Sequence, residues 1–180
     1  ILDINVGVPG GDEVALMREA VKAVQSVVNI PLQIDSSNPE AIEAGLRVYN
    51  GRAIVNSVNA EDERLDLILP IVKKYGAAVI GLALNESGLP TTAQQRVDNA
   101  SHILKRCLEY GLKKEDVIID CLTLTVSAQQ DQARETLEAV RMVTNDLGLH
   151  TTLGVSNISF GLPARSHITE NFLIQAMYAG

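Results

Sequence analysis

The fold is decided by one stretch of the chain, Pro31-Leu32-Gln33-Ile34-Asp35-Ser36-Ser37-Asn38-Pro39-Glu40. A short apolar run ends at Asp35, and such a run is typical of a strand that is buried on both faces. Asn38 and Pro39 then place a helix-capping residue before a proline suited to the first helical turn. The stretch therefore predicts a strand, a polar strand end and the start of a helix within a few residues.

The same order of elements recurs along the whole chain. Each apolar run is followed by a segment with apolar residues at helical spacing. Thr92 and Gln95 resemble a capping box that begins one helix. Three glycines, Gly76, Gly111 and Gly148, each follow a helical segment at the position where a residue in the left-handed conformation ends a helix. The pattern predicts six strands, over residues 1–6, 31–35, 52–56, 77–84, 116–120 and 151–155.

Strict alternation of strands and helices indicates a parallel sheet with helical crossovers, either an open doubly wound sheet or a closed barrel. An open sheet concentrates its site at one crevice, whereas a barrel collects all its strand ends around one mouth. Polar residues end nearly every expected strand, so we expect an α/β fold of the parallel (β/α) TIM-barrel type. The glycine-rich segment at residues 7–11 does not match the dinucleotide-binding pattern of open sheets. The polar residues are Asp3, Asn5, Asp35, Ser36, Ser37, Asn56, Ser57, Asn59, Asn85, Glu86, Asp120, Ser156 and Asn157.

Composition and charge exclude several classes of protein. Of 180 residues, 46% are apolar and 21% charged, which predicts a folded core. The net charge of −7 and the aromatic content of 3% argue against a nucleic-acid binder. No apolar run approaches the roughly 20 residues of a membrane helix, and the N-terminus does not resemble a signal peptide. Cys107 and Cys121 have no CxxC spacing, so we expect two reduced thiols in a cytoplasmic protein.

The strand ends carry acids and amides rather than histidines or lysines. Asp120 follows an apolar run, so its carboxylate needs a hydrogen-bonding partner. His102, His150 and His167 fall elsewhere and are interpreted as structural or solvated, and no HExxH or similar motif predicts a metal. The segment around Ser156 lacks the second glycine of a nucleophile elbow, which argues against a serine hydrolase. Two carboxylates and two amides suit a neutral heterocycle with several N–H and C=O groups.

Some of the polar residues have a simpler structural interpretation. Ser36, Ser37 and Asn38 equally suit a turn and a helix cap, and Asn59 suits a turn.

The segments around these residues closely resemble the pterin-binding methyltransferase barrels. That family includes the folate domain of cobalamin-dependent methionine synthase and the methyltetrahydrofolate:corrinoid/iron–sulfur protein methyltransferases. The related dihydropteroate synthases share the barrel but carry a basic motif where Asn157 and Ser159 stand here, so their activity is the less favoured one. The resemblance covers essentially the whole chain and is carried by Leu2-Asp3-Ile4-Asn5-Val6-Gly7, Ile34-Asp35-Ser36-Ser37-Asn38-Pro39, Ile54-Val55-Asn56-Ser57-Val58-Asn59, Leu84-Asn85-Glu86-Ser87-Gly88-Leu89-Pro90, Ile118-Ile119-Asp120 and, most specifically, Gly154-Val155-Ser156-Asn157-Ile158-Ser159-Phe160-Gly161-Leu162-Pro163.

The resemblance implies roles for four residues. Asp35, Asn56 and Asp120 match the family positions that hydrogen-bond the pterin ring. Asn157 matches the asparagine that approaches the ring nitrogen bearing the methyl group, and it is the expected catalytic residue.

Five further residues match the family near the barrel mouth. Asp3 and Asn5 match a motif that either contacts the ligand or supports the residues that do, and Ser57 is expected in the same supporting role. Asn85 and Glu86 lie in a loop that the family places near the mouth.

The resemblance implies a methyltransferase that binds 5-methyltetrahydrofolate and passes its methyl group to cob(I)alamin carried by another domain or protein. The domain needs no metal of its own, and a homodimer is compatible with the family. No nucleic acid or membrane partner is expected. Two alternatives stay open: a dihydropteroate synthase-like enzyme, and a non-catalytic module that binds pterin or docks a corrinoid protein. Homocysteine and a corrinoid/iron–sulfur protein are both compatible as final acceptors, and the last motif favours a methionine synthase.

One departure concerns length. A barrel of this type needs about 250 residues, and only six of its eight strand–helix units can be counted. The family's first strand carries a Glu-Arg-Ile-Asn-like motif that has no counterpart, and the last strand is missing. We therefore expect residues 1–180 to be one truncated pterin-binding domain that lacks its first and last strands and belongs to a larger protein.

Overall fold

The computed structural model describes residues 1–180. Six parallel strands form one sheet whose spatial order follows the chain order, β1-β2-β3-β4-β5-β6. A doubly wound sheet reverses its strand order, so this topology confirms the expected parallel α/β architecture of the TIM-barrel type. The strands are β1 (Leu2–Asn5), β2 (Leu32–Asp35), β3 (Ile54–Val58), β4 (Ala78–Leu82), β5 (Val117–Asp120) and β6 (His150–Thr152).

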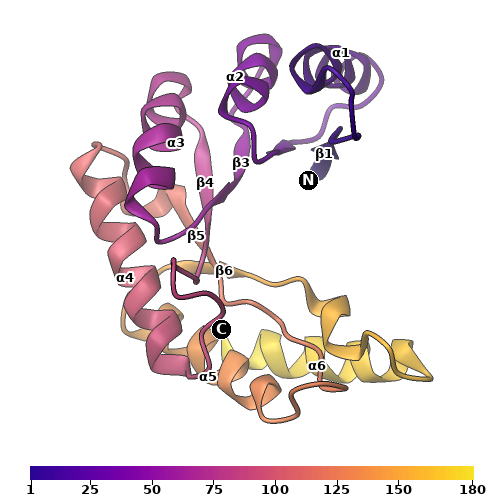
Figure 1. Cartoon of the computed structure of the whole chain (residues 1–180), viewed down its shortest axis with the longest axis vertical. Helices are drawn as coiled ribbons and strands as arrows, with labels where there is room; N and C mark the ends of the chain where they lie inside the picture. The colour runs from indigo at the N-terminus through magenta and orange to yellow at the C-terminus, as the bar shows by residue number, and fades with distance from the viewer.

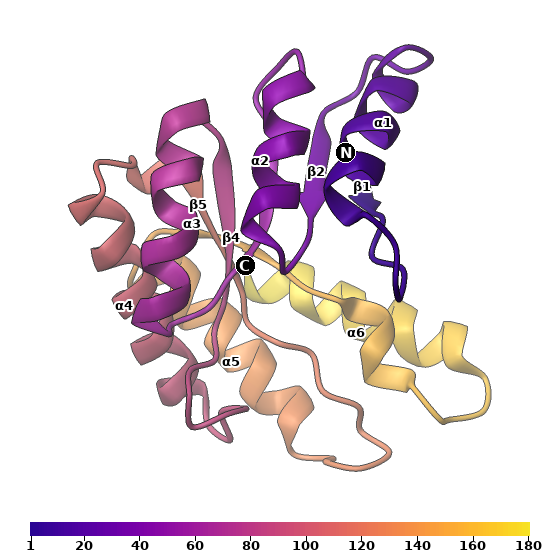
Figure 2. The same ribbon diagram turned by 45° about the horizontal axis from the view of Figure 1, so that its top comes forward.

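Helices connect successive strands and follow one another around the outside of the curved sheet (Figure 1). Figure 2 shows α1 and α2 standing beside β1 and β2, whereas α6 lies across the other end of the molecule. Short 3-10 helices precede β5 and follow β6. The helices are α1 (Glu13–Gln25), α2 (Pro39–Val48), α3 (Asp62–Tyr75), α4 (Ala93–Glu109), α5 (Gln132–Asn145) and α6 (Arg165–Ala179), with η1 (Lys114–Asp116) and η2 (Val155–Ser159).

The helix boundaries confirm the capping signals of the sequence. Asn38 accepts a hydrogen bond from the Glu40 amide at 2.9 Å, directly before Pro39 begins α2. Thr92 and Gln95 form the capping box of α4. Gly76 ends α3 with a φ of 65°, the left-handed conformation that glycine adopts without steric cost.

The two faces of the sheet differ in burial. One face is covered by helices, and its alternate strand residues are fully or almost fully buried, each contributing about 1.5–3 kcal/mol of apolar burial. Packing is close where α4 meets β4, because a Cβ on Gly81 would lie 2.8 Å from Cγ2 of Ile103. The opposite face is open, and its polar side chains are exposed or half-buried. The helix-covered residues include Ile4, Ile34, Val55, Val79 and Ile119.

The expected bounds of three strands were wrong. β4 ends at Leu82, and the chain turns through Asn85, whose side chain accepts from the Ser87 amide at 2.9 Å. β3 continues to Val58, with a register shift between Asn56 and Val58. β6 begins at His150 and ends at Thr152, because the chain turns at Leu153–Val155 and enters η2.

No helix is both long enough and apolar enough to span a membrane.

Candidate functional site

Three of the expected site residues form a row across the first three strands. Asn5 of β1 pairs in register with Asp35 of β2, and Asp35 pairs with Asn56 of β3. Residues paired in a parallel sheet share one face, and here it is the open one. Nδ2 of Asn5 donates a hydrogen bond to Oδ2 of Asp35 at 2.9 Å. The row therefore presents an acid between two amides.

A second acid, Asp3, lies earlier in β1 than Asn5 and on the same face of the sheet. Asp3 pairs in register with Gln33, whose Nε2 donates to Oδ1 of Asp3 at 2.6 Å. Burial raises the pKa of the Asp3 carboxyl, the Gln33 hydrogen bond opposes that rise, and the nearby Asp35 carboxylate adds to it. Two acids thus lie close together on the open face, and the surroundings of Asp3 favour its neutral form.

Asp120 ends β5 on the same face of the sheet, beyond Ile118, the residue that continues the row through Ile80 of β4. Its register partners are Leu82 of β4 and Thr152 of β6. Oδ1 accepts the Leu122 amide at 2.8 Å, and Oδ2 receives no donor from the protein. Burial raises the pKa of the Asp120 carboxyl, and the Leu122 hydrogen bond offsets only part of this effect. The free oxygen is available to a donor, and a ligand N–H remains the sequence-based prediction for it.

Asn157 lies apart from these residues, on η2. Its side chain is exposed and folds over Gly154, where a Cβ would lie 2.9 Å from its Nδ2. It makes no hydrogen bond to the row. Arg165 holds η2 in place, donating from Nη2 to the Ser156 carbonyl at 3.0 Å and from Nε to Oγ of Ser159 at 3.2 Å.

The remaining polar residues have mainly structural roles. The buried hydroxyl of Ser36 donates to Glu13 at 2.5 Å. Asn59 accepts the Glu61 amide at 3.1 Å, as expected of a turn residue. Nδ2 of Asn85 donates to Asn99 at 2.9 Å, whereas Glu86 and Ser37 are exposed. The Ser57 backbone carbonyl accepts a hydrogen bond from Arg64 at 3.0 Å.

Sequence reasoning missed two arginines behind the site. Arg96 is fully buried, and its Nε donates to the Cys121 carbonyl at 2.8 Å, directly after Asp120. Its Nη2 donates to Gln132 of α5 at 2.8 Å. The available signal was helical spacing, because Arg96 lies four residues before Ala100 on the buried face of α4. Arg64 of α3 carried no such signal.

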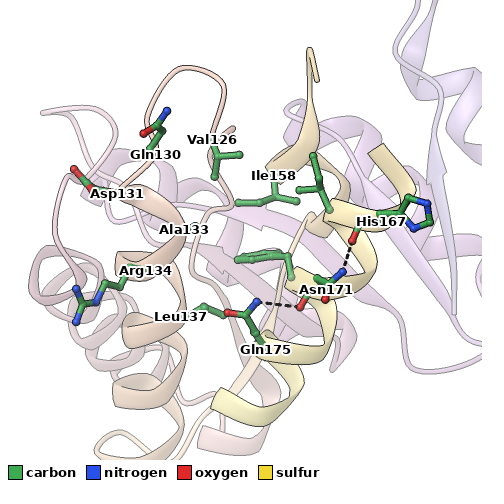
Figure 3. Close-up of a pocket in the computed structure, with 12 residues that line it drawn as sticks. Val126, Gln130, Asp131, Ala133, Arg134, Leu137, Ile158, His167, Asn171 and Gln175 are labelled. Carbon is green, nitrogen blue, oxygen red and sulfur yellow. Dashed lines mark hydrogen bonds between the residues drawn. The ribbon is translucent and has the colours of Figure 1, made fainter. Parts of the chain in front are cut away.

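Two of the protein's cavities differ in the residues that line them. The first, of about 360 Å³, opens beside Asp35 and is also lined by Ser57, Arg64 and Leu82. The second, of about 610 Å³, is a groove between α5 and α6 with apolar residues such as Val126, Leu137 and Ile158 (Figure 3). None of the acids of the open sheet face lines the larger groove, so the smaller cavity belongs to the candidate site.

The polar groups of the larger groove are partly engaged within α6. Nδ2 of Asn171 donates to the His167 carbonyl at 2.7 Å, and Nε2 of Gln175 donates to the Asn171 carbonyl at 3.3 Å (Figure 3). No three His, Cys, Asp or Glu side chains gather in a geometry that would hold a metal ion. His102 instead bonds Asp62 on the surface at 2.9 Å.

Comparisons with known proteins give consistent results. The sequence model of a family described as pterin binding enzyme matches residues 1–180. The methionine synthase of Mycobacterium leprae (strain TN) is 34% identical over 193 residues, which cover 100% of this chain and 16% of that protein. The methylcorrinoid:tetrahydrofolate methyltransferase of Eubacterium limosum is 27% identical over 99% of this chain and 67% of its own length. This chain thus spans only a small part of the methionine synthase that it matches.

Solved structures show the same fold. Dihydropteroate synthase from Thermus thermophilus, in complex with 6HMPPP, superposes with a TM-score of 0.69 over 99% of this chain and 73% of that one, at 21% identity. The synthase from Xanthomonas albilineans in complex with 7,8-dihydropteroate gives a TM-score of 0.70 over 99% of this chain and 70% of that one, at 17% identity. At these identities the likeness concerns the fold alone.

Proposed function

The chain belongs to the pterin-binding enzyme family, and on that premise we propose that it is the folate-binding part of a methyltransferase. In this proposal the open face of the sheet binds 5-methyltetrahydrofolate, and the methyl group passes to cob(I)alamin carried by another domain or protein. The matches to a methionine synthase and to a methylcorrinoid:tetrahydrofolate methyltransferase support this class of reaction. The methionine synthase match has the higher identity, which favours homocysteine as the final acceptor.

The observation that carries the proposal is the set of hydrogen-bonding groups on the open face. Asp35 and Asp120 offer carboxylate oxygens at the ends of β2 and β5, and Asn56 offers an amide oxygen within β3, with one Asp120 oxygen free of any protein donor. The aminopyrimidinone edge of a pterin carries N–H donors next to a carbonyl. Hydrogen bonds from such N–H groups to carboxylates contribute about 1.5–3 kcal/mol each.

Asn157 supplies the catalytic step in this proposal. The methyl group leaves a tertiary amine, and that nitrogen must gain a proton or a strong hydrogen bond by the transition state. An amide that strengthens its hydrogen bond only as charge shifts there lowers the barrier. Asn157 does not titrate near neutral pH, so the proton comes from solvent or from a network. Its exposed position on η2 leaves the side chain free to turn toward the ligand.

Cob(I)alamin, when bound by its own carrier, supplies the nucleophile that accepts the methyl group. The residues of this chain fit that arrangement because the acids and amides serve the pterin, and Asp35 and Asp120 lie at the C-terminal ends of β2 and β5. These strand ends form the mouth of a barrel, which is the side that faces a large partner.

We further propose that residues 1–180 form six of the eight units of one barrel domain within a larger protein. β1 and β6 each pair with a single neighbouring strand, and the chain spans 16% of the methionine synthase that it matches. Closing strands from the rest of the protein would cover both edges. A cytoplasmic setting and a homodimer belong to the same proposal, on the sequence arguments above.

The test is methyl transfer by the full-length protein. We expect saturable binding of 5-methyltetrahydrofolate and methylation of cob(I)alamin. The loss of the cob(I)alamin absorbance measures the methylation. Formation of dihydropteroate from p-aminobenzoate and a pterin pyrophosphate would favour a synthase instead. Folate binding without methyl transfer would favour a non-catalytic module.

A further inference from the structure

Arg64 of α3 connects the two backbone segments that directly follow Asp35 and Asn56. Its Nη1 donates to the Ser37 carbonyl at 2.5 Å, and its Nη2 donates to the Ser36 carbonyl at 3.2 Å and to the Ser57 carbonyl at 3.0 Å. Ser36 directly follows Asp35, and Ser57 directly follows Asn56. One guanidinium therefore holds the backbone immediately beyond both side chains.

The contacts of Arg64 begin where the pairing of β2 with β3 ends. The register of β2 and β3 stops at Asp35 and Asn56, and the next backbone hydrogen bond runs from the Ser36 amide to the Asn56 carbonyl at 3.1 Å. Beyond that point β3 shifts its register against β4. Arg64 donates to the carbonyls of Ser36 and Ser57, and so a side chain continues the connection between the backbones of these two segments.

The chemistry of Arg64 suits this role. The side chain is half-buried and forms no salt bridge, and burial lowers the pKa of its guanidinium. A planar guanidinium presents five N–H donors in a fixed fork that reaches several acceptors at once. Lysine is a single point of charge on a flexible chain and cannot reproduce that fork.

We propose that Arg64 is a positioning residue for pterin recognition, because it sets the spacing between Asp35 and Asn56. This inference rests on the function proposed above. Arg64 acts on residues that recognise the bound ring, whereas Asn157 lies on a different element. Loss of Arg64 therefore weakens folate binding and leaves the methyl-transfer step at saturating folate nearly unchanged.

The experiment compares Arg64→Ala and Arg64→Lys with the wild type in the full-length protein. Arg47→Ala is the matched control, because Arg47 lies on α2 and pairs only with Glu43 on the same helix. Loss of the three hydrogen bonds is expected to raise the Kd for 5-methyltetrahydrofolate about tenfold or more in Arg64→Ala. The lysine variant stays close to the alanine variant, and kcat at saturating folate stays within about twofold of the wild type.

Two further readouts separate positioning from general stability. Guanidinium chloride at low millimolar concentration should partly restore the affinity of Arg64→Ala, whereas equal sodium chloride should not. Hydrogen exchange of the Ser36 amide, measured without ligand, should become faster in Arg64→Ala but not in Arg47→Ala. If the alanine variant does not fold, Arg64→Lys is judged by the same Kd and exchange criteria.

Several results would overturn the inference. They are an unchanged Kd in both Arg64 variants, an equal rise in Kd in Arg47→Ala, or a fall in kcat as large as the loss of affinity. A wild-type protein that does not bind 5-methyltetrahydrofolate would instead overturn the proposed function. The exchange rate of the Ser36 amide would then still show whether Arg64 holds together the backbone segments at Ser36 and Ser57.

Discussion

The amide of Asn5 donates a hydrogen bond to the Asp35 carboxylate at 2.9 Å, from one strand to its neighbour in register. The contact fixes the orientation of the carboxylate and occupies Oδ2, so that Oδ1 remains for a ligand. A side chain 30 residues earlier in the chain thus prepares the acid that we propose for pterin binding.

Replacement of Asn5 should therefore act through Asp35. Asn5→Ala should weaken binding of 5-methyltetrahydrofolate by about 1 kcal/mol, the value of one typical hydrogen bond. Asp35→Ala removes the acceptor itself and should cost about 1.5–3 kcal/mol. Isothermal titration calorimetry of the full-length protein measures both. A larger loss for Asn5→Ala than for Asp35→Ala would assign direct ligand contact to Asn5.

Asn157→Ala tests the catalytic residue. The variant should lower the rate of methyl transfer at saturating folate by about 10²-fold or more, as does the loss of other groups that act in the transition state. Its Kd for 5-methyltetrahydrofolate should change far less. Single-turnover kinetics with cob(I)alamin give the rate, and Ser156→Ala is the neighbouring control. Equal losses in rate and affinity would remove the transition-state role from Asn157.

Asp120 should make stability depend on pH in a defined direction. Burial raises the pKa of its carboxyl above the usual value of 3.8, so the folded state holds the proton to higher pH than the unfolded chain does. The contribution of this carboxyl to the free energy of unfolding is fully present below pH 3.8. It is lost as the pH rises through the folded-state pKa. Without ligand, Asp120→Asn should be about 1–2 kcal/mol more stable than the wild type at pH 7.

The difference between the two proteins should shrink as the pH falls toward 3.8, since the wild-type carboxyl is then protonated as well. Urea titrations followed by circular dichroism measure it at each pH. Asp98→Asn, at an exposed position on α4, controls for the loss of an ordinary carboxylate. A wild type more stable than Asp120→Asn at pH 7 would contradict the assignment.

The two cysteines should be inert in the folded protein. Burial raises the pKa of both thiols to about 12, and the Asp120 carboxylate adds to the effect at Cys121. At pH 8 only about one thiol in ten thousand is then ionised, and the thiolate is the reactive form. Iodoacetamide followed by peptide mapping should label Cys107 and Cys121 only after denaturation. Rapid labelling of either residue in the native protein would show that its surroundings open.

The strands and helices were largely predictable, because their signals are local. An apolar run, a polar end and a capping residue lie within ten positions of one another at residues 31–40, and the structure forms β2 and α2 there. The end of β6 was less predictable. Thr151-Thr152-Leu153-Gly154-Val155 suits a strand by composition, but a turn leads the chain into η2 at Val155.

Relations between distant residues were not predictable from local patterns. The row of Asn5, Asp35 and Asn56 depends on strand register, which only the assembled sheet defines. Arg64 stands in a charged segment and resembles an ordinary surface arginine, and only the folded chain brings the carbonyls of Ser36 and Ser57 to it. Arg96 was the easier case, since a charged residue on an apolar helical face is unusual.

The strand order that follows the chain has an evolutionary consequence. Four strands, β1, β2, β3 and β5, contribute Asn5, Asp35, Asn56 and Asp120 to the shared open face, and no unit contributes the whole recognition set. Substitution or loop replacement in one unit can therefore reshape one wall of the site while the neighbouring walls keep their geometry. Ligand preference in this architecture can diversify by small independent steps, and that modularity is consistent with two different chemistries among proteins of the same fold.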